Sequence, residues 1–282
     1  MTDLIDGRYA LRDEIGRGAT AAVHRARDVQ GGEVAIKLLT ANRGSRQAVG
    51  RFIREAHLAS QLQHPNNTRI LDFGAADQGM YLVMELLTGE TLESRIFREG
   101  PLPPRAAAGV AICVASALGE AHGLGIIHRD LKPANIFLHR DGRGTTVKLM
   151  DFGVAKLAST ESRKAGGLYA TTLVGTDKLP PIGTVQYMAP EQVKGKQELS
   201  PASDLYSLGC LLYKMLTGDP PFSGENQFAV MRCQVQDPPP RLSFLTPTEL
   251  ADVVYKLLEK EPEMRPGSAA EVVSALRGWL LS

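Results

Sequence analysis

The spacing of hydrophobic and polar positions changes along the chain and divides it into two parts. From residue 8 to residue 40, short apolar runs are separated by glycines and charged residues, which is typical of β-strands; Glu33–Leu39 is the strongest. Residues 46–62 follow a helical period instead, and two further strands are predicted at 69–73 and 80–85. The apolar face of the predicted helix consists of Ala48, Phe52, Ala59 and Leu62.

The second part of the chain is mostly helical. A helix begins at Pro103-Pro104, where proline is tolerated in the first turn, and runs to about Gly123. Residues 202–216 are apolar on almost every side, which predicts a buried central helix. Two more helices are predicted at 247–259 and 268–281.

Polar residues gather in the stretch His128–Asn135, which lies between apolar runs and is followed by Asp151-Phe152-Gly153. The strand that follows Asn135 turns back at Gly142, so a hairpin is expected to place Asp151 beside Asn135. Carboxylate and amide oxygens at one point suit Mg²⁺, a hard cation that prefers oxygen ligands. Asp130 is then left to orient a nucleophile.

The order H-R-D-L-x-x-x-N followed by D-F-G resembles the signature of the protein kinases. The resemblance extends from Gly16 to Arg265 and includes Val34-Ala35-Ile36-Lys37 and Ala189-Pro190-Glu191. Within that family, the chain is similar to the eukaryotic-type serine/threonine kinases of bacteria. The implied fold class is α+β in two lobes: residues 1–88 form a β-rich lobe with one main helix, and residues 89–282 form a mostly helical lobe.

By the same resemblance, the chain transfers the γ-phosphoryl group of ATP to serine and threonine hydroxyl groups of proteins. Asp130 would orient the hydroxyl and accept its proton, Lys132 would neutralise charge, and Thr184 would bond to Asp130. Asn135 and Asp151 would hold Mg²⁺, with Mn²⁺ as a possible substitute. The residues implied in nucleotide binding are Ile15, Gly16, Gly18, Val23, Ala35, Lys37, Glu85, Leu87 and Phe137. Glu85 and Leu87 would act through their backbone groups.

Glu55 lies in the middle of the apolar face of the first helix. A carboxylate there costs free energy unless it finds a cation. A structural role is one explanation, but the resemblance favours an ion pair between Glu55 and Lys37, which marks the active arrangement in these kinases. The resemblance also implies that Asp204 anchors the backbone of the catalytic loop and that Arg265 pairs with Glu191.

Two departures from the family pattern stand out. Ala21 occupies the place of the third glycine of the phosphate-binding loop, which should stiffen that loop without abolishing nucleotide binding. Asn67-Thr68 follow the first helix where similar kinases have aliphatic residues. We expect these polar groups to weaken the packing of the Glu55 helix on the next strand.

Residues 151–191 are rich in glycine, serine, threonine and proline, which fits a long activation segment. In this family an arginine such as Arg129 goes with control by phosphorylation, since a phosphate can order a loop through arginine contacts. The candidate hydroxyls are Ser159, Thr160, Ser162, Tyr169, Thr171, Thr172 and Thr176. Thr176 is the first choice and Thr172 the second; the alternative for each is an ordinary solvated hydroxyl.

Composition and charge limit the partners and the cellular compartment expected for the chain. The 282 residues carry a net charge of +1, so no overall field attracts nucleic acid or anionic lipid. Three widely spaced cysteines match no metal pattern and fit a reducing compartment. No signal peptide is recognised, and the uncharged run 106–119 is too short to span a bilayer. We expect a cytoplasmic chain, one domain of a longer protein, that forms a transient homodimer for autophosphorylation.

Two other functions fit the same fold. A pseudokinase that scaffolds partners normally lacks one of the key residues, whereas Lys37, Glu55, Asp130, Asn135 and Asp151 are all present. A small-molecule phosphotransferase usually has glycine in place of Arg129 and lacks the A-P-E segment. Both alternatives are therefore disfavoured.

Overall fold

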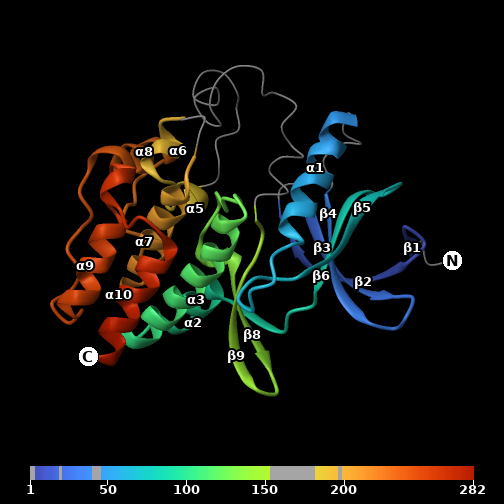
Figure 1. Cartoon of the computed structure of the whole chain (residues 1–282), viewed down its shortest axis with the longest axis horizontal. Coiled ribbons are helices and arrows are strands. Elements are labelled where there is room, and N and C mark those ends of the chain that lie inside the picture. Colours follow the sequence, from blue (N-terminus) through green and yellow to red (C-terminus); the bar gives the residue numbers. More distant parts are fainter. Residues whose placement is uncertain (1–3, 19–20, 40–45, 153–181, 196–198) are drawn as a thin grey trace.

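The structure is a computed structural model that describes residues 4–18, 21–39, 46–152, 182–195 and 199–282. Its strands and helices separate into a β-rich lobe, formed by the N-terminal part of the chain, and a mostly helical lobe formed by the C-terminal part (Figure 1). This is the α+β, two-lobed arrangement that the sequence predicts.

One antiparallel sheet of six strands forms most of the small lobe, in the order β1-β2-β3-β4-β6-β5. Its strands are β1 (Leu4–Ile5), β2 (Tyr9–Arg17), β3 (Ala21–Asp28), β4 (Glu33–Leu39), β5 (Ile70–Ala76) and β6 (Gly79–Glu85). Because side chains alternate along a strand, β4 serves two cores. Val34 and Ile36 pack with Tyr81 and Val83, whereas Leu39 faces the core beneath the first helix.

The helix α1 (Arg46–Ala59) lies against β5 and β6 (Figure 1). Phe52 and Ala56 pack on Leu39, Met80 and Leu82 of the sheet. The predicted apolar face is confirmed, since all four of its residues are buried: Ala48, Phe52, Ala59 and Leu62. Leu62 follows the helix and joins the core of the large lobe.

The large lobe consists of helices around one main apolar core and one smaller apolar cluster, together with a small sheet. Its helices are α2 (Leu92–Glu99), α3 (Pro104–Gly123), α5 (Ile182–Val185), α6 (Pro190–Val193), α7 (Pro201–Thr217), α8 (Gln227–Gln236), α9 (Thr248–Leu257) and α10 (Ala269–Leu281), with 3-10 turns η1 (Pro133–Asn135) and η2 (Pro262–Met264). The sheet has the order β7-β8-β9, formed by β7 (Gly89–Thr91), β8 (Ile136–Asp141) and β9 (Gly144–Leu149).

The helix α7 is buried on almost every side, as its composition predicts, and it packs against α3 and α9. By length and composition alone, α3 could cross a membrane, and it is longer than the uncharged run in the sequence indicates. In the structure it belongs to the core of the large lobe and packs against α7 and α10. Its apolar character is thus accounted for by packing within the protein.

The polar residues Asn67 and Thr68 make their hydrogen bonds to the large lobe. The Asn67 side chain is fully buried and its Nδ2 donates to the carbonyl oxygen of Ala117, at 3.2 Å, and to Glu120 Oε2, at 2.9 Å. The amide of Thr68 donates to the carbonyl of Leu149 in β9. We expected these residues to loosen the contact between α1 and the next strand; instead they fasten the chain after α1 to α3 and β9.

The packing of α7 on α9 generates a test of the fold. A Cβ at Gly209 would lie 2.8 Å from Cβ of Leu257 and 3.1 Å from Leu258. We therefore expect Gly209→Ala to lower the free energy of unfolding by about 1–3 kcal/mol through overpacking. Gly109→Ala, in α3, meets no atom within 4 Å and should instead stabilise by about 0.5–1 kcal/mol, because alanine favours helix. Denaturant unfolding of both variants checks this; equal changes would contradict it.

Candidate active site

The buried carboxylate of Asp204, in the first turn of α7, fastens the loop that carries the polar residues. Asp204 accepts hydrogen bonds from the amides of His128, at 2.8 Å, and Arg129, at 2.9 Å. His122 Nε2, on α3, lies 2.9 Å from the same carboxylate. The expected anchoring of the catalytic loop by Asp204 is confirmed.

The loop has an unusual backbone at Arg129, whose φ is +65°. Residues other than glycine rarely adopt this left-handed conformation, so the bonds to Asp204 must offset its cost. The neighbouring His128 accepts from the amide of Asp130 at Nδ1, at 3.3 Å. Its Nε2 therefore carries the proton and donates to the carbonyl of Met150, at 2.8 Å, while its ring packs 4.8 Å from that of Phe152. His128 thus joins the catalytic loop to residues 150–152.

Asp130, Lys132, Asn135 and Thr184 form one cluster. Lys132 Nζ lies 3.3 Å from Asp130 Oδ2 and donates to Thr184 Oγ1, at 3.1 Å. Asn135 Nδ2 donates to the Asp130 carbonyl, at 2.7 Å, and lies 3.3 Å from Asp130 Oδ2. The sequence places Thr184 on Asp130 directly; the hydrogen bond that the structure gives Thr184 is to Lys132, which links the two.

Asn135 and Asp151 are neighbours, as the hairpin predicts. Ile136 pairs with Leu149 in the ladder of β8 and β9, and the amide of Met150 donates to the Asn135 carbonyl, at 2.9 Å. Because Asn135 Nδ2 is engaged with Asp130, its side-chain oxygen remains an acceptor. Asp151 has φ +61°, which turns it out of the extended strand. One carboxylate and one carboxamide oxygen donor of this kind fit Mg²⁺.

Lys37 contacts Asp151 and not Glu55. Lys37 Nζ lies 2.6 Å from Asp151 Oδ1, and the lysine side chain is 14% exposed. Among the residues that the structure describes, Glu55 forms no ion pair, so the expected pair between Glu55 and Lys37 is absent in this conformation. The half-exposed Glu55 carboxylate retains contact with water, which avoids the cost of a buried unpaired charge.

The residues expected to bind nucleotide lie on adjoining strands. Gly16 pairs with Val23, and Val23 pairs with Lys37, so these three positions form a row across β2, β3 and β4. Ala35 is buried and pairs with Met84 of β6. The row leads from Gly16 of the phosphate-binding loop to the ammonium group of Lys37. Such an arrangement suits a chain of phosphates.

Further residues expected to bind nucleotide lie on β2, on β8 and where the chain passes from β6 to β7. Ile15 is 48% exposed at the end of β2, and Phe137 lies on β8. The amide of Leu87 makes no hydrogen bond within the described ranges, so it is available as a donor. The side chain of Glu85 accepts from Lys148 Nζ, at 2.7 Å, which fits a role for Glu85 through its backbone alone.

Sequence reasoning did not single out Lys148. Its ammonium is buried between the carbonyl of Asn67, at 3.4 Å, and Glu85. The signal available in the sequence was a lysine inside the otherwise apolar run that ends at Met150. A buried lysine needs a carboxylate partner, but the sequence does not reveal which one.

A buried ion pair joins Glu191, in α6, to Arg265, which follows η2. Arg265 donates to both carboxylate oxygens, at 2.8 and 2.9 Å. Its other donors reach the carbonyls of Ala202, Glu259 and Lys260, so all five N–H groups are satisfied. Burial alone would raise the pKa of Glu191, but the bonds from Arg265 lower it below its ordinary value. The pairing expected from the A-P-E motif is confirmed.

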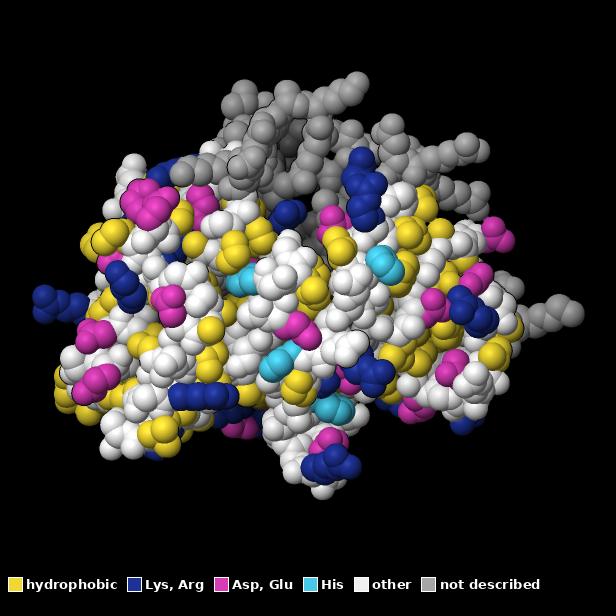
Figure 2. Space-filling view, viewed as in Figure 1, with side chains coloured by type: hydrophobic (Ala, Val, Ile, Leu, Met, Phe, Trp, Pro, Cys, Tyr) yellow, Lys and Arg dark blue, Asp and Glu magenta, His cyan; other side chains and the backbone are white. Residues whose placement is uncertain are grey.

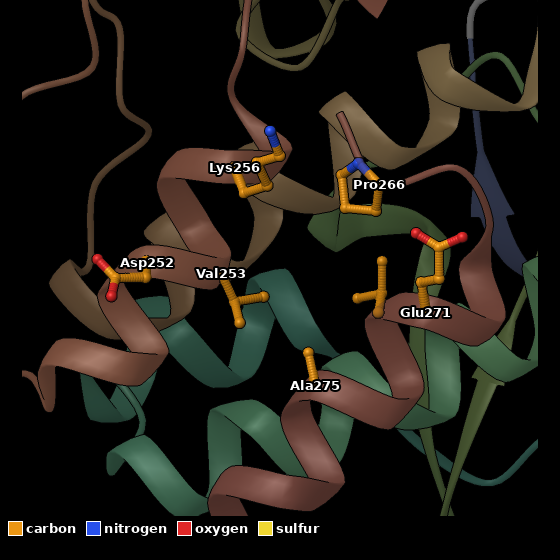
Figure 3. Close-up of a pocket in the computed structure, with 7 residues that line it drawn as sticks. Asp252, Val253, Lys256, Pro266, Glu271 and Ala275 are labelled. Carbon is orange, nitrogen blue, oxygen red and sulfur yellow. The ribbon is translucent and has the colours of Figure 1, made fainter. Parts of the chain in front are cut away.

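The candidate phosphorylation sites lie outside the described residues: Ser159, Thr160, Ser162, Tyr169, Thr171, Thr172 and Thr176. A separate cavity of about 420 Å³ lies between α9 and α10, away from the catalytic loop (Figure 3). It has an apolar floor with Asp252, Lys256 and Glu271 around it. None of the expected site residues lines this cavity.

The chain is similar to known proteins along nearly its whole length. A family model described as a protein kinase domain matches residues 9–276. The serine/threonine-protein kinase PknB of Mycobacterium leprae is 38% identical over 95% of this chain and 42% of its own length. A probable serine/threonine-protein kinase of Streptomyces coelicolor is 39% identical over 95% of this chain and 39% of its own length.

Among solved structures, Rad53 residues 1–466 in complex with AMP-PNP superimposes with a TM-score of 0.72. Its sequence is 26% identical, and the match covers 95% of this chain and 64% of that one. The chain therefore spans about two fifths of the length of the curated relatives, at 42% and 39%.

The pair between Glu191 and Arg265 predicts how stability depends on pH. Because the pKa of Glu191 is lowered on folding, its contribution is present above the unfolded pKa of about 4.3 and is lost as pH falls through the folded value. Glu191→Gln leaves the buried Arg265 charge unpaired and should cost about 3–5 kcal/mol. The exposed Glu263→Gln should change stability by less than about 0.5 kcal/mol. Thermal unfolding between pH 3 and pH 7 checks this; identical losses in the two variants would refute it.

Proposed function

The chain belongs to the protein kinase family, and from this premise we propose that it transfers the γ-phosphoryl group of ATP to serine and threonine hydroxyl groups of proteins. Support comes from relatives named serine/threonine-protein kinases that align with nearly the whole chain. Because those relatives are much longer, their other activities and partners are not assumed for this chain.

The observation that carries the proposal is the cluster of Asp130, Lys132 and Asn135 on one anchored loop. A substrate hydroxyl beside Asp130 would be oriented by its carboxylate and would give it a proton as the oxygen attacks the γ-phosphorus of ATP and the bond from that phosphorus to ADP breaks. Lys132, 3.3 Å from that carboxylate, neutralises charge on the phosphoryl group in transfer. Most of the rate enhancement then comes from positioning and from charge neutralisation. Thr184, bonded to Lys132, keeps the ammonium in place.

ATP is the proposed phosphoryl donor. The AMP-PNP bound to Rad53 is an ATP analogue, which supports nucleotide use by a similar fold. Asn135 and Asp151 would hold Mg²⁺ or Mn²⁺ through oxygen; when bound, the ion offsets charge on the phosphate oxygens. Lys37 ends the row of residues that leads from the glycine loop, so its ammonium would contact the phosphates.

We infer that the conformation described is a resting one. Lys37 and Asp151 bind each other at 2.6 Å, although each is needed for a different part of the metal–nucleotide complex. Nucleotide and metal would draw them apart. The released ammonium of Lys37 would then pair with Glu55, as the resemblance to the family implies. A lysine that exchanges one carboxylate for another keeps its charge compensated throughout.

Phosphorylation of the activation segment is proposed as the regulatory step. Nε of Arg129 is buried and has no hydrogen-bond partner in the described part of the chain. An unpaired buried guanidinium nitrogen is costly, and a phosphate oxygen would satisfy it. Thr176 and Thr172 are the preferred acceptors, as they are in the sequence analysis.

The rest of the proposal concerns the lobe boundary, the location and the partners of the chain. The boundary between the lobes falls between residues 88 and 89, because β7 pairs with β8 and not with the first sheet. The chain acts in the cytoplasm, where ATP is available, and forms a transient homodimer for autophosphorylation.

No nucleic-acid partner is proposed, since basic and acidic side chains are interspersed on the visible face (Figure 2) and the net charge is +1. No observation favours a pseudokinase or a small-molecule phosphotransferase.

The first test is direct transfer. Purified protein incubated with Mg²⁺-ATP and a generic protein substrate should produce phosphoserine and phosphothreonine. Asp130→Asn should lower the rate by about 10²- to 10⁴-fold, the usual contribution of a general base, while leaving the fold intact. Phosphoamino-acid analysis and initial rates provide the measurement. A product dominated by phosphotyrosine, or a fully active Asp130→Asn variant, would refute the assignment.

The second test concerns regulation. Autophosphorylated protein should have a higher initial rate than phosphatase-treated protein, because the added charge engages Arg129. The variant with Thr171, Thr172 and Thr176 all changed to alanine should keep the lower rate under both treatments. Mass spectrometry identifies the sites that are modified. Equal rates in all of these samples would show that this segment is not the switch.

A further inference from the structure

The turn 243–246, which leads into α9, displays two large apolar side chains to solvent. Phe244 is 93% exposed and Leu245 is 75% exposed. The turn is nevertheless ordered, because the amide of Thr246 donates to the Ser243 carbonyl, at 2.9 Å, and the amide of Leu245 donates to Ser243 Oγ, at 3.2 Å. Two neighbouring apolar side chains that an ordered turn holds in water are typical of an interaction surface.

The cavity between α9 and α10 lies beside this turn. The amide of Leu242 donates to the hydroxyl of Tyr255, at 2.7 Å, and Tyr255 directly precedes Lys256, one of the residues that line the cavity. In Figure 3, Val253 from α9 and Ala275 from α10 extend toward each other across the apolar floor. The cavity volume of about 420 Å³ falls within the range of about 300–1,000 Å³ that ligand pockets occupy.

The turn does not fill the cavity of its own chain, since both of its large side chains are exposed. A two-fold axis beside α9 would bring the turn of each chain to the cavity of the other, because an isologous interface uses the same surface of both chains. The apolar side chains of both turns would then leave water together. Because the turn is already ordered, it would lose little conformational entropy on binding.

The charges on the turn and on the cavity are complementary. Arg241 carries the only charge in residues 241–247; it is exposed, and it forms no ion pair within the described part of the chain. Asp252, Glu271 and Lys256 border the cavity, so two carboxylates and one ammonium give it a net charge of −1. Glu271 already accepts a backbone amide, at 2.9 Å, whereas Asp252 is exposed to solvent. Asp252 is therefore the carboxylate that best suits Arg241 of a second chain.

We propose that the turn 243–246 and the cavity between α9 and α10 form a self-complementary surface that binds a second copy of this chain. Phe244 and Leu245 of each chain enter the cavity of the other. Arg241 of each chain pairs with Asp252 of the other. None of the expected site residues lines this surface, so the association does not depend on the proposed function. It also differs from the encounter for autophosphorylation, which must bring a hydroxyl of one chain to the catalytic loop of the other.

Analytical ultracentrifugation without nucleotide tests the association. From low micromolar to submillimolar concentration, the wild-type protein should form a weak dimer whose fraction rises with concentration. Phe244→Ala should raise the dissociation constant by about tenfold or more, as the loss of a central aromatic side chain does. Phe97→Ala is the matched control: Phe97 lies on α2 and is 92% exposed, and its loss should leave the constant unchanged. A monomeric wild-type protein, or equal effects of the two variants, overturns the proposal.

Charge reversal tests whether the two chains meet as proposed. Arg241→Glu and Asp252→Arg should each raise the dissociation constant by about tenfold, because each places like charges opposite one another. The chain that carries both substitutions should regain the wild-type constant, since the pair is then restored with its signs exchanged. Losses that add in the double variant would contradict this pairing.

A mixing experiment tests the two-fold arrangement. Ala275 is exposed, so Ala275→Trp should fill the cavity without disturbing the core. An equimolar mixture of Phe244→Ala and Ala275→Trp chains should dimerise more tightly than either variant alone, because the mixed pair keeps one intact turn and one intact cavity. No gain on mixing overturns the proposal. Phosphate transfer is measured separately on the wild-type protein, so its failure would refute the proposed function and leave this result standing.

Discussion

The buried carboxylate of Asp204 is the interaction on which the active site depends. It accepts the amides of His128 and Arg129 and lies beside His122, so one side chain of the central helix fixes the backbone of the catalytic loop. This fixation offsets the cost of the left-handed conformation at Arg129. With the backbone set, His128 can bond to Met150 and join the loop to the segment that carries Asp151.

Lys37 provides one charged link between the lobes, and the pair of Lys148 and Glu85 provides another. The ammonium of Lys37 lies 2.6 Å from Asp151, which follows β9 of the large lobe. This contact keeps two opposite charges paired in a partly desolvated site, but it also withholds both from a nucleotide and its metal. On the proposed function, activation amounts to an exchange of partners in which Lys37 leaves Asp151 for Glu55. The chain that follows α1 is hydrogen-bonded to Glu120 of α3.

The sequence was sufficient for most of the elements and for the membership of the site. The helical periods that predict α1, α3, α7, α9 and α10 were correct, because each helix buries a continuous face or its whole surface. The motif around Asp130 identified the residues that meet there. Partner choice was less accessible: the sequence indicated Glu55 for Lys37, whereas the structure pairs it with Asp151. Such a choice depends on how the lobes and α1 are placed, and periodicity within one element carries no information about that. The same limit explains why Asn67 was assigned to the wrong contact and why Lys148 was overlooked.

The central claim is that Asp151 gives up Lys37 in order to bind the metal of a metal–nucleotide complex. Calorimetric titration with AMP-PNP, in the presence and absence of Mg²⁺, measures this in the wild-type protein and in Asp151→Asn. The account predicts that Mg²⁺ tightens AMP-PNP binding to the wild-type protein by about tenfold or more and has little effect on the variant. The same Mg²⁺ effect in both proteins would contradict it.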